Sequence, residues 1–97
     1  MNMREVKDLK DTAEMMSSED YKERFRAEYH QTKIRYERLK KFNTEIEAVS
    51  KMPYDMPCRI EMPKHDCPEG ILREQQRCMG EYLHLLELRA VIEGIDL

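Results

Sequence analysis

The 97-residue sequence contains no tryptophan, only three glycines and no long apolar run. Without a glycine-rich stretch it has neither the G-x-x-x-x-G-K-[S/T] nor the G-x-G-x-x-G loop that cradles phosphates. No segment approaches the roughly 20 apolar residues that cross a membrane, and no N-terminal segment resembles a signal peptide. These absences exclude glycine-loop nucleotide sites and predict a cytoplasmic protein with no membrane partner.

Cysteine is scarce, and its spacing argues against both disulfides and metal. Cys58, Cys67 and Cys78 leave one thiol unpaired in any intramolecular scheme, which predicts free thiols in a reducing compartment. His65 and Cys67 could bind a metal with Cys58, but structural zinc sites use paired ligands such as C-x-x-C, and this chain has none. A Cys67 nucleophile beside His65 would lack a third group to orient it. We therefore expect no metal, no cofactor, no catalytic residue and no enzyme activity.

Proline is confined to one region and thereby divides the chain. All four prolines lie between residues 53 and 68, whereas residues 18–50 contain neither proline nor glycine. Because proline and its preceding residue disfavour helix, the pattern predicts a Pro-rich loop over 51–65 between helices at 18–50 and 66–94. Asp66 is the expected N-cap of the second helix, and Ser17 and Ser18 are the expected caps of the first. Residues 1–16 form an amphipathic arm that either docks on a neighbouring subunit or frays.

The apolar pattern predicts a single all-α domain over 1–97, an antiparallel helical hairpin that assembles into a homo-oligomer. In the first helix a heptad-like seam recurs at spacings of three and four; its members are Phe25, Tyr29, Thr32, Tyr36, Leu39, Asn43 and Ile46. Asn43 is the polar position that can fix register. Gly80 indicates a close helix crossing. The outside of the second helix, around Leu83, Leu88 and Val91, stays apolar, and a small chain gains the missing burial by assembly.

The charge is uneven along the chain. Residues 21–43 carry eight Lys or Arg against three Glu, although the whole chain has a net charge of -3. Cations and rings alternate along this helix at spacings of four and three: Lys22, Arg26, Tyr29, Lys33, Tyr36 and Lys40. Such a stripe suits a ligand with phosphates and bases, because cations meet phosphates and rings stack on bases. The alternative is that the tyrosines belong to the core and the cations are solvated. Overall acidity argues against duplex nucleic acid.

Both helices resemble a family of small phage helical-hairpin proteins of the type found in crAss-like phages. The matching positions span about 60 residues, and Leu39 and Lys40 stand in reversed order against the family pattern. They are Tyr21, Glu23, Arg24, Glu28, Tyr29, Arg38, Leu39, Lys40, Phe42, Gln75, Met79, Tyr82, Leu83, Leu86 and Arg89. In architecture such proteins are similar to anti-CBASS sponges, oligomers that sequester cyclic oligonucleotide immune signals between protomers.

The resemblance implies a phage-encoded sponge that binds a cyclic oligonucleotide second messenger, such as 3′,3′-cGAMP, without cleaving it. The expected ligand contacts follow from the cation–aromatic stripe and the basic loop. Tyr29 and Tyr36 would stack on bases, and His65 would hydrogen-bond. The cations expected to hold phosphates are Arg26, Lys33, Arg59, Lys64 and Arg73. The alternative is a phage adaptor that binds a host protein through its helical surface.

Overall fold

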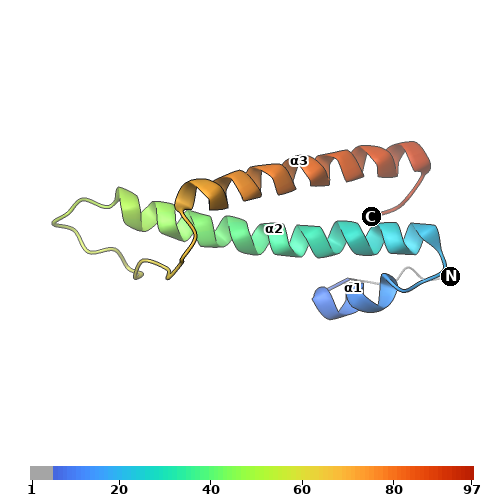
Figure 1. Ribbon diagram of the computed structural model, residues 1–97, viewed down its shortest axis with the longest axis horizontal. Coiled ribbons are helices and arrows are strands. Elements are labelled where there is room, and N and C mark those ends of the chain that lie inside the picture. Colours follow the sequence, from blue (N-terminus) through green and yellow to red (C-terminus); the bar gives the residue numbers. More distant parts are fainter. Residues whose placement is uncertain (1–5) are drawn as a thin grey trace.

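The computed structural model describes residues 6–97 as an all-α chain, which confirms the predicted fold class. Its helices are α1 (Leu9–Met15), α2 (Tyr21–Lys51) and α3 (Glu69–Glu93). α2 and α3 run antiparallel and are joined at one end by residues 52–68, while α1 lies along the N-terminal half of α2 (Figure 1). Residues 1–5 of the predicted arm lie outside the described part.

The first long helix begins at an acidic cap. α2 starts at Tyr21, after the predicted start at residue 18, and the side chain of Asp20 accepts a hydrogen bond from the backbone N–H of Lys22 at 3.0 Å. Ser18 takes a supporting role instead of capping: its hydroxyl oxygen accepts from the Asp20 N–H at 3.1 Å. An acidic side chain at this end is stabilised by the unpaired N–H groups and by the helix dipole.

The ends of α3 differ from each other in how they are capped. The predicted cap at Asp66 is wrong, because Pro68 is the N-cap and no side chain bonds to the first turn. The Pro68 carbonyl accepts from the N–H groups of Ile71 and Leu72 at 3.1 and 3.2 Å, which starts the helical ladder. At the other end Gly94 adopts φ 70°, a left-handed conformation that glycine reaches without strain.

The interface between α2 and α3 follows the predicted seam. Five seam residues are buried, and Tyr36 and Leu39 are half-buried; the buried ones are Phe25, Tyr29, Thr32, Asn43 and Ile46. From the other side Leu83, Leu86 and Ala90 close the core. The seam is therefore confirmed as the surface that holds the hairpin together.

The N-terminal arm packs on its own chain. Thr12 and Met15 of α1 are fully buried, as is Ala27 on the facing side of α2. Gln31 reaches across the same contact, and its amide donates to the Thr12 hydroxyl at 3.5 Å. The prediction that the arm docks on a neighbouring subunit is wrong for residues 9–15, because their apolar face is already covered by α2.

A polar group inside the seam ties the two long helices together. The buried amide of Asn43 donates to the Leu72 carbonyl at 3.1 Å and to Gln76 Oε1 at 2.9 Å. A slip of one helical turn, about 5.4 Å, would leave these groups unpaired. Asn43 therefore fixes the register of α3 against α2, the role that its seam position predicts.

One side of α3 remains apolar and uncovered. Leu85, Leu88, Val91 and Ile92 are 57%, 47%, 82% and 81% exposed, and we call these four residues the outer patch. Leu83, which was expected on this outside surface, is instead buried in the core. Covering a fully exposed aliphatic side chain contributes about 1.5–3 kcal/mol, so the hairpin alone leaves a large driving force unused.

Removing the Asn43 amide tests its role in register. Asn43→Ala should lower the free energy of unfolding by about 1–3 kcal/mol, because the Leu72 carbonyl and Gln76 Oε1 both lose the donor that bonds them across the two helices. The neighbouring Thr44→Ala is the control: Thr44 is exposed and its hydroxyl bonds only within its own helix, to the Lys40 carbonyl. That variant should stay within about 0.5 kcal/mol of wild type in urea denaturation followed by circular dichroism. Equal losses in both variants would contradict the register role of Asn43.

Candidate functional site

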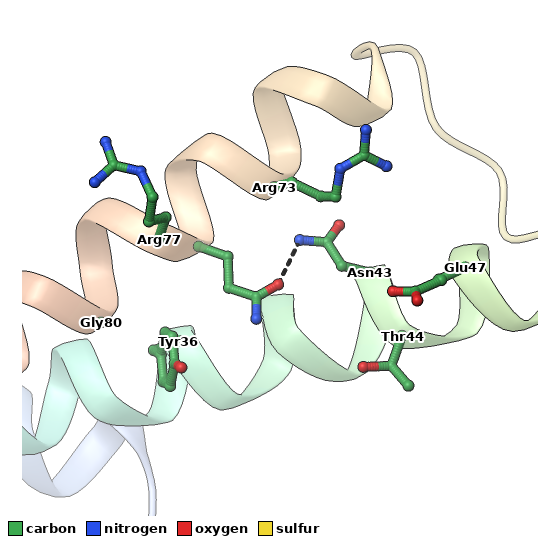
Figure 2. Close-up of a pocket in the computed structure, with 8 residues that line it drawn as sticks. Tyr36, Asn43, Thr44, Glu47, Arg73, Arg77 and Gly80 are labelled. Carbon is green, nitrogen blue, oxygen red and sulfur yellow. Dashed lines mark hydrogen bonds between the residues drawn. The ribbon is translucent and has the colours of Figure 1, made fainter.

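A groove of about 330 Å³ runs between α2 and α3 near the loop end of the hairpin. Its size falls at the lower end of the about 300–1,000 Å³ typical of small-molecule sites. α2 contributes Tyr36, Asn43, Thr44 and Glu47, and α3 contributes Arg73, Gln76, Arg77 and Gly80 (Figure 2). The groove thus combines a phenol ring, two guanidinium groups and two amides.

The wall of the groove depends on the glycine in the middle of α3. A Cβ placed on Gly80 would lie 3.4–3.6 Å from three atoms of the Tyr36 phenol, which is van der Waals contact, so a side chain larger than alanine would press on the ring. Figure 2 shows the ring pointing at α3 beside Gly80. The close crossing predicted from Gly80 is confirmed, and its physical consequence is that Tyr36 is held on edge at the groove.

Both arginines of the groove form ion pairs within α3. Arg73 lies 3.5 Å from Glu69, while Arg77 is hydrogen-bonded to Glu74 and lies 2.6 Å from Glu81. Their side chains are 61% and 54% exposed, and exposed ion pairs contribute only about 0–1 kcal/mol. An anionic ligand can therefore exchange for these carboxylates at little cost.

The carboxylate in the groove is held in its charged form. Lys51 Nζ donates to Glu47 at 2.7 Å and lowers the pKa of Glu47, and the charge of Arg73 acts in the same direction. A carboxylate with a lowered pKa is a weak proton acceptor, so it is poorly suited to general base catalysis near neutral pH. The groove offers binding chemistry more than proton transfer.

A second, more open hollow of about 680 Å³ continues from the groove along α3. The two share Tyr36, Arg77 and Gly80, and the hollow adds Glu81, His84 and Leu85. Figure 2 shows the Arg77 side chain extending away from α2, and Arg77 lines both the groove and the hollow. Leu85 also belongs to the outer patch, so the hollow ends at that apolar surface.

Of the eight residues predicted to bind ligand, the structure brings only Tyr36 and Arg73 into this groove. Tyr29 is a core residue: its ring is 5% exposed and its hydroxyl donates to Glu87 Oε2 at 2.6 Å. The expectation that Tyr29 stacks on a base is therefore wrong for this hairpin, because the ring is covered by α3.

Arg26 and Lys33 belong to a different region of α2, around His30. Burial lowers the pKa of His30, and the charges of Arg26 and Lys33 lower it further. Lys33 lines a separate hollow of about 470 Å³ together with Val6 and Arg38. Its Nζ lies 5.9 Å from the centre of the Tyr29 ring, a cation–π contact. The stripe is thus split between two faces of the helix.

The three predicted contacts in the loop lie at the far end of the hairpin from α1 (Figure 1). Arg59 and Lys64 are exposed there. His65 is half-buried, its Nδ1 lies 2.8 Å from the Pro63 carbonyl oxygen, and its ring packs edge-on to Phe42 at 6.0 Å. His65 therefore anchors the loop to α2 and does not reach the groove residues.

Four polar residues of α3 that line the groove or the hollow were not predicted from the sequence: Gln76, Arg77, Glu81 and His84. A usable signal was present, because Arg73, Gln76, Arg77 and Gly80 recur at spacings of three, one and three and so share one side of a helix. Only one of the predicted cations lies on α3, whereas both cations of the groove come from this more acidic helix.

Fold and groove define a class: a small helical-hairpin protein with an open polar groove of ligand size. Within this class the chain belongs to the sequestin family, whose model matches residues 19–92. The match covers α2, the loop and α3 and leaves out α1. No curated protein and no solved structure matches the chain. The family name is consistent with a sequestering protein, in agreement with the sponge resemblance.

No helix in the described range is long and apolar enough to cross a bilayer.

The buried Tyr29 hydroxyl predicts a loss of stability in alkali. Burial and the hydrogen bond to Glu87 raise the pKa of Tyr29 to about 12, from a usual value near 10. The folded state therefore holds the phenol proton more tightly than the unfolded state does. This contribution to the free energy of unfolding is complete below pH 10 and is lost as the pH rises from about 10 to 12. The loss should be on the order of 2 kcal/mol.

Tyr29→Phe should remove this alkaline component when urea unfolding is repeated between pH 9 and 12. Tyr54→Phe is the matched control, because Tyr54 is fully exposed in the loop. The dependence of unfolding free energy on pH in each variant is compared with that of wild type. The same slope in wild type and Tyr29→Phe would contradict the burial of a neutral phenol.

Proposed function

We propose that this chain is a phage-encoded sponge that acts in the host cytoplasm. It sequesters a cyclic oligonucleotide immune signal and does not cleave it. Membership of the sequestin family supports sequestration of a ligand, and the resemblance to anti-CBASS sponges supports a cyclic nucleotide such as 3′,3′-cGAMP. The observation that carries the proposal is that Tyr36, Arg73 and Arg77 all line one groove.

Three kinds of group in the groove match parts of such a ligand: a ring, guanidinium groups and an amide. The accessible part of the Tyr36 ring offers a surface for a base, and stacking on aromatic rings tolerates any base. Arg73 and Arg77 offer planar donor forks, the geometry that phosphate oxygens accept best. The half-buried Gln76 carries an amide whose N–H groups can pair with a base edge while its oxygen stays bonded to Asn43. The ligand would replace the exposed carboxylate partners of both arginines.

Retention without turnover is the second part of the proposal. Glu47 is the carboxylate of the groove, and its lowered pKa makes it a poor base. A sponge needs tight binding of the ground state, whereas an enzyme must favour the transition state over the substrate. The signal should therefore be recovered intact after it is released from the protein.

A thermal-shift screen tests the proposal directly. Cyclic dinucleotides, cyclic trinucleotides and cyclic ADP-ribose isomers are added one at a time, and the bound compound is recovered and analysed by mass spectrometry. A ligand at a hundred times its Kd stabilises the fold by about 2.7 kcal/mol, which for a chain of this size raises Tm by roughly 10 °C or more. No shift with any nucleotide, or recovery of a cleaved product, would refute the sponge.

A pair of glycine variants tests whether the groove is the binding site. Gly80→Leu should abolish the thermal shift, because the new side chain occupies the space beside Tyr36. Gly70→Leu is matched in chemistry and lies in the same helix, but nothing is within 4 Å of a Cβ there, so it should keep the full shift. Leu at position 80 can also press α2 and α3 apart, so circular dichroism and urea unfolding must show that both variants are folded before their thermal shifts are compared. Equal shifts in the two variants would move the site elsewhere.

A further inference from the structure

The hollow beside the groove offers a different set of polar groups from the groove itself. The groove takes two cations from α3, Arg73 and Arg77. Its carboxylate, Glu47, is already bonded to Lys51 at 2.7 Å. Among the described residues that line the hollow, Arg77 is the one arginine or lysine, and it faces the carboxylate of Glu81. Phosphate is therefore favoured in the groove, whereas the hollow favours an uncharged part of the ligand that carries N–H donors.

The lining of the hollow also has the form that a nucleobase requires. The Tyr36 ring and Leu85 supply apolar surface for the flat face of a base. Glu81 and His84, three residues apart on α3, lie on one side of the helix and supply a polar edge. At about 680 Å³ the hollow has room for a purine. It thus combines an apolar face with a polar edge, as a base does.

We infer that the hollow is a base subsite selective for guanine, with Glu81 accepting hydrogen bonds from guanine N1–H and from the 2-amino group. The inference rests on the proposed function, because the phosphates of the same ligand would lie at Arg73 and Arg77 in the adjoining groove. Under this assignment Glu81 determines which base the protein retains.

A carboxylate distinguishes guanine from the other bases by its hydrogen-bonding edge. An ionised carboxylate only accepts hydrogen bonds, and its two oxygens can accept a parallel pair of them. Guanine presents two adjacent donors, N1–H and the 2-amino group, to such a fork. Adenine and cytosine place a ring-nitrogen lone pair beside their amino donor, and uracil places carbonyl oxygens beside its N3–H, so one carboxylate oxygen would face an acceptor. A mismatch of this kind costs more than the lost bond, because a polar group stays unpaired.

Arg77 and His84 fit the same orientation of the base. Arg77 Nη1 donates to Glu81 Oε1 at 2.6 Å, which holds the carboxylate at the hollow. A carboxylate has about four acceptor sites, so this bond leaves Glu81 able to accept from the ligand as well. The His84 imidazole carries an N–H donor, and guanine O6, next to N1–H, is an acceptor. Arg77 therefore links the phosphate in the groove to the base in the hollow.

Base analogues test the selectivity of the hollow. Calorimetric titration of the full chain should show wild type binding cyclic di-GMP roughly tenfold or more tighter than cyclic di-AMP, the difference expected from hydrogen bonds to a charged acceptor. The mixed dinucleotide 3′,3′-cGAMP carries one guanine and should bind as tightly as cyclic di-GMP. Cyclic di-IMP, whose bases keep N1–H and O6 but lack the 2-amino group, should bind roughly tenfold more weakly than cyclic di-GMP.

A pair of glutamate variants assigns the selectivity to one side chain. Glu81→Gln replaces an acceptor oxygen by an amide donor, so the preference for cyclic di-GMP over cyclic di-AMP should fall to within about threefold. Glu74→Gln is the matched control, because Glu74 also bonds Arg77 from the same helix but lines neither the groove nor the hollow. It removes the same charge and should keep the wild-type preference. Both side chains are exposed, and circular dichroism should show both variants folded.

Three results would overturn the guanine subsite. The first is equal affinity of wild type for cyclic di-GMP and cyclic di-AMP. The second is the same preference in wild type and Glu81→Gln. The third is an equal loss of preference in Glu74→Gln, since the selectivity would then come from the ion pairs of Arg77 and not from the carboxylate in the hollow.

The titrations also separate this inference from the proposed function. A wild type that binds both dinucleotides equally, or prefers cyclic di-AMP, leaves the sponge intact and removes only the guanine subsite. A wild type that binds no cyclic nucleotide removes both. The expected result is retention of the guanine-containing dinucleotides by wild type and Glu74→Gln, with the preference lost in Glu81→Gln.

Discussion

The hydrogen bonds of one buried amide set the alignment of the two long helices. Asn43 bonds to Leu72 and Gln76 across the seam, and an amide without partners in that environment would be costly. With this register fixed, Tyr36 comes to lie against Gly80 and the groove forms beside them. At the opposite end the same register lets Tyr21 donate to Glu93 at 2.9 Å and accept from Arg89 at 2.5 Å. The groove is thus a consequence of alignment more than of any single binding residue.

The cations that border the groove come from α3 and are paired only with exposed carboxylates, an arrangement that leaves them available to an anion. The basic residues of α2 are spread over several faces, whereas Arg73 and Arg77 stand at the groove with exposed and replaceable carboxylate partners. An overall acidic chain can still bind an anion under these conditions, because screening limits distant charges to about 8–10 Å at physiological salt. Local geometry, not net charge, determines what the groove can bind.

The small size of the chain explains why so much apolar surface is left on α3. Two helices can bury only the facing side of each other, and α1 covers part of α2 but none of the outer patch. The side of α3 that carries Leu88 therefore has no partner within the described hairpin. This exposed apolar surface begins at Leu85, the residue that also lines the hollow.

The sequence by itself determined the helical hairpin, the seam and the role of Asn43, because heptad spacing and the confinement of proline act locally along the chain. It did not determine the site. Tyr29 and Tyr36 stand seven residues apart on the same seam, yet Tyr29 is covered and Tyr36 borders the groove. That difference arises only where α3 crosses α2, since Gly80 opens space beside Tyr36, whereas the Tyr29 ring packs in the core with Leu83 and Leu86. Likewise, Lys33 and Arg73 were both predicted to hold phosphate, and only the tertiary structure shows that Arg73 lines the groove and Lys33 does not. The side of a helix that a neighbour covers depends on packing between segments distant in sequence.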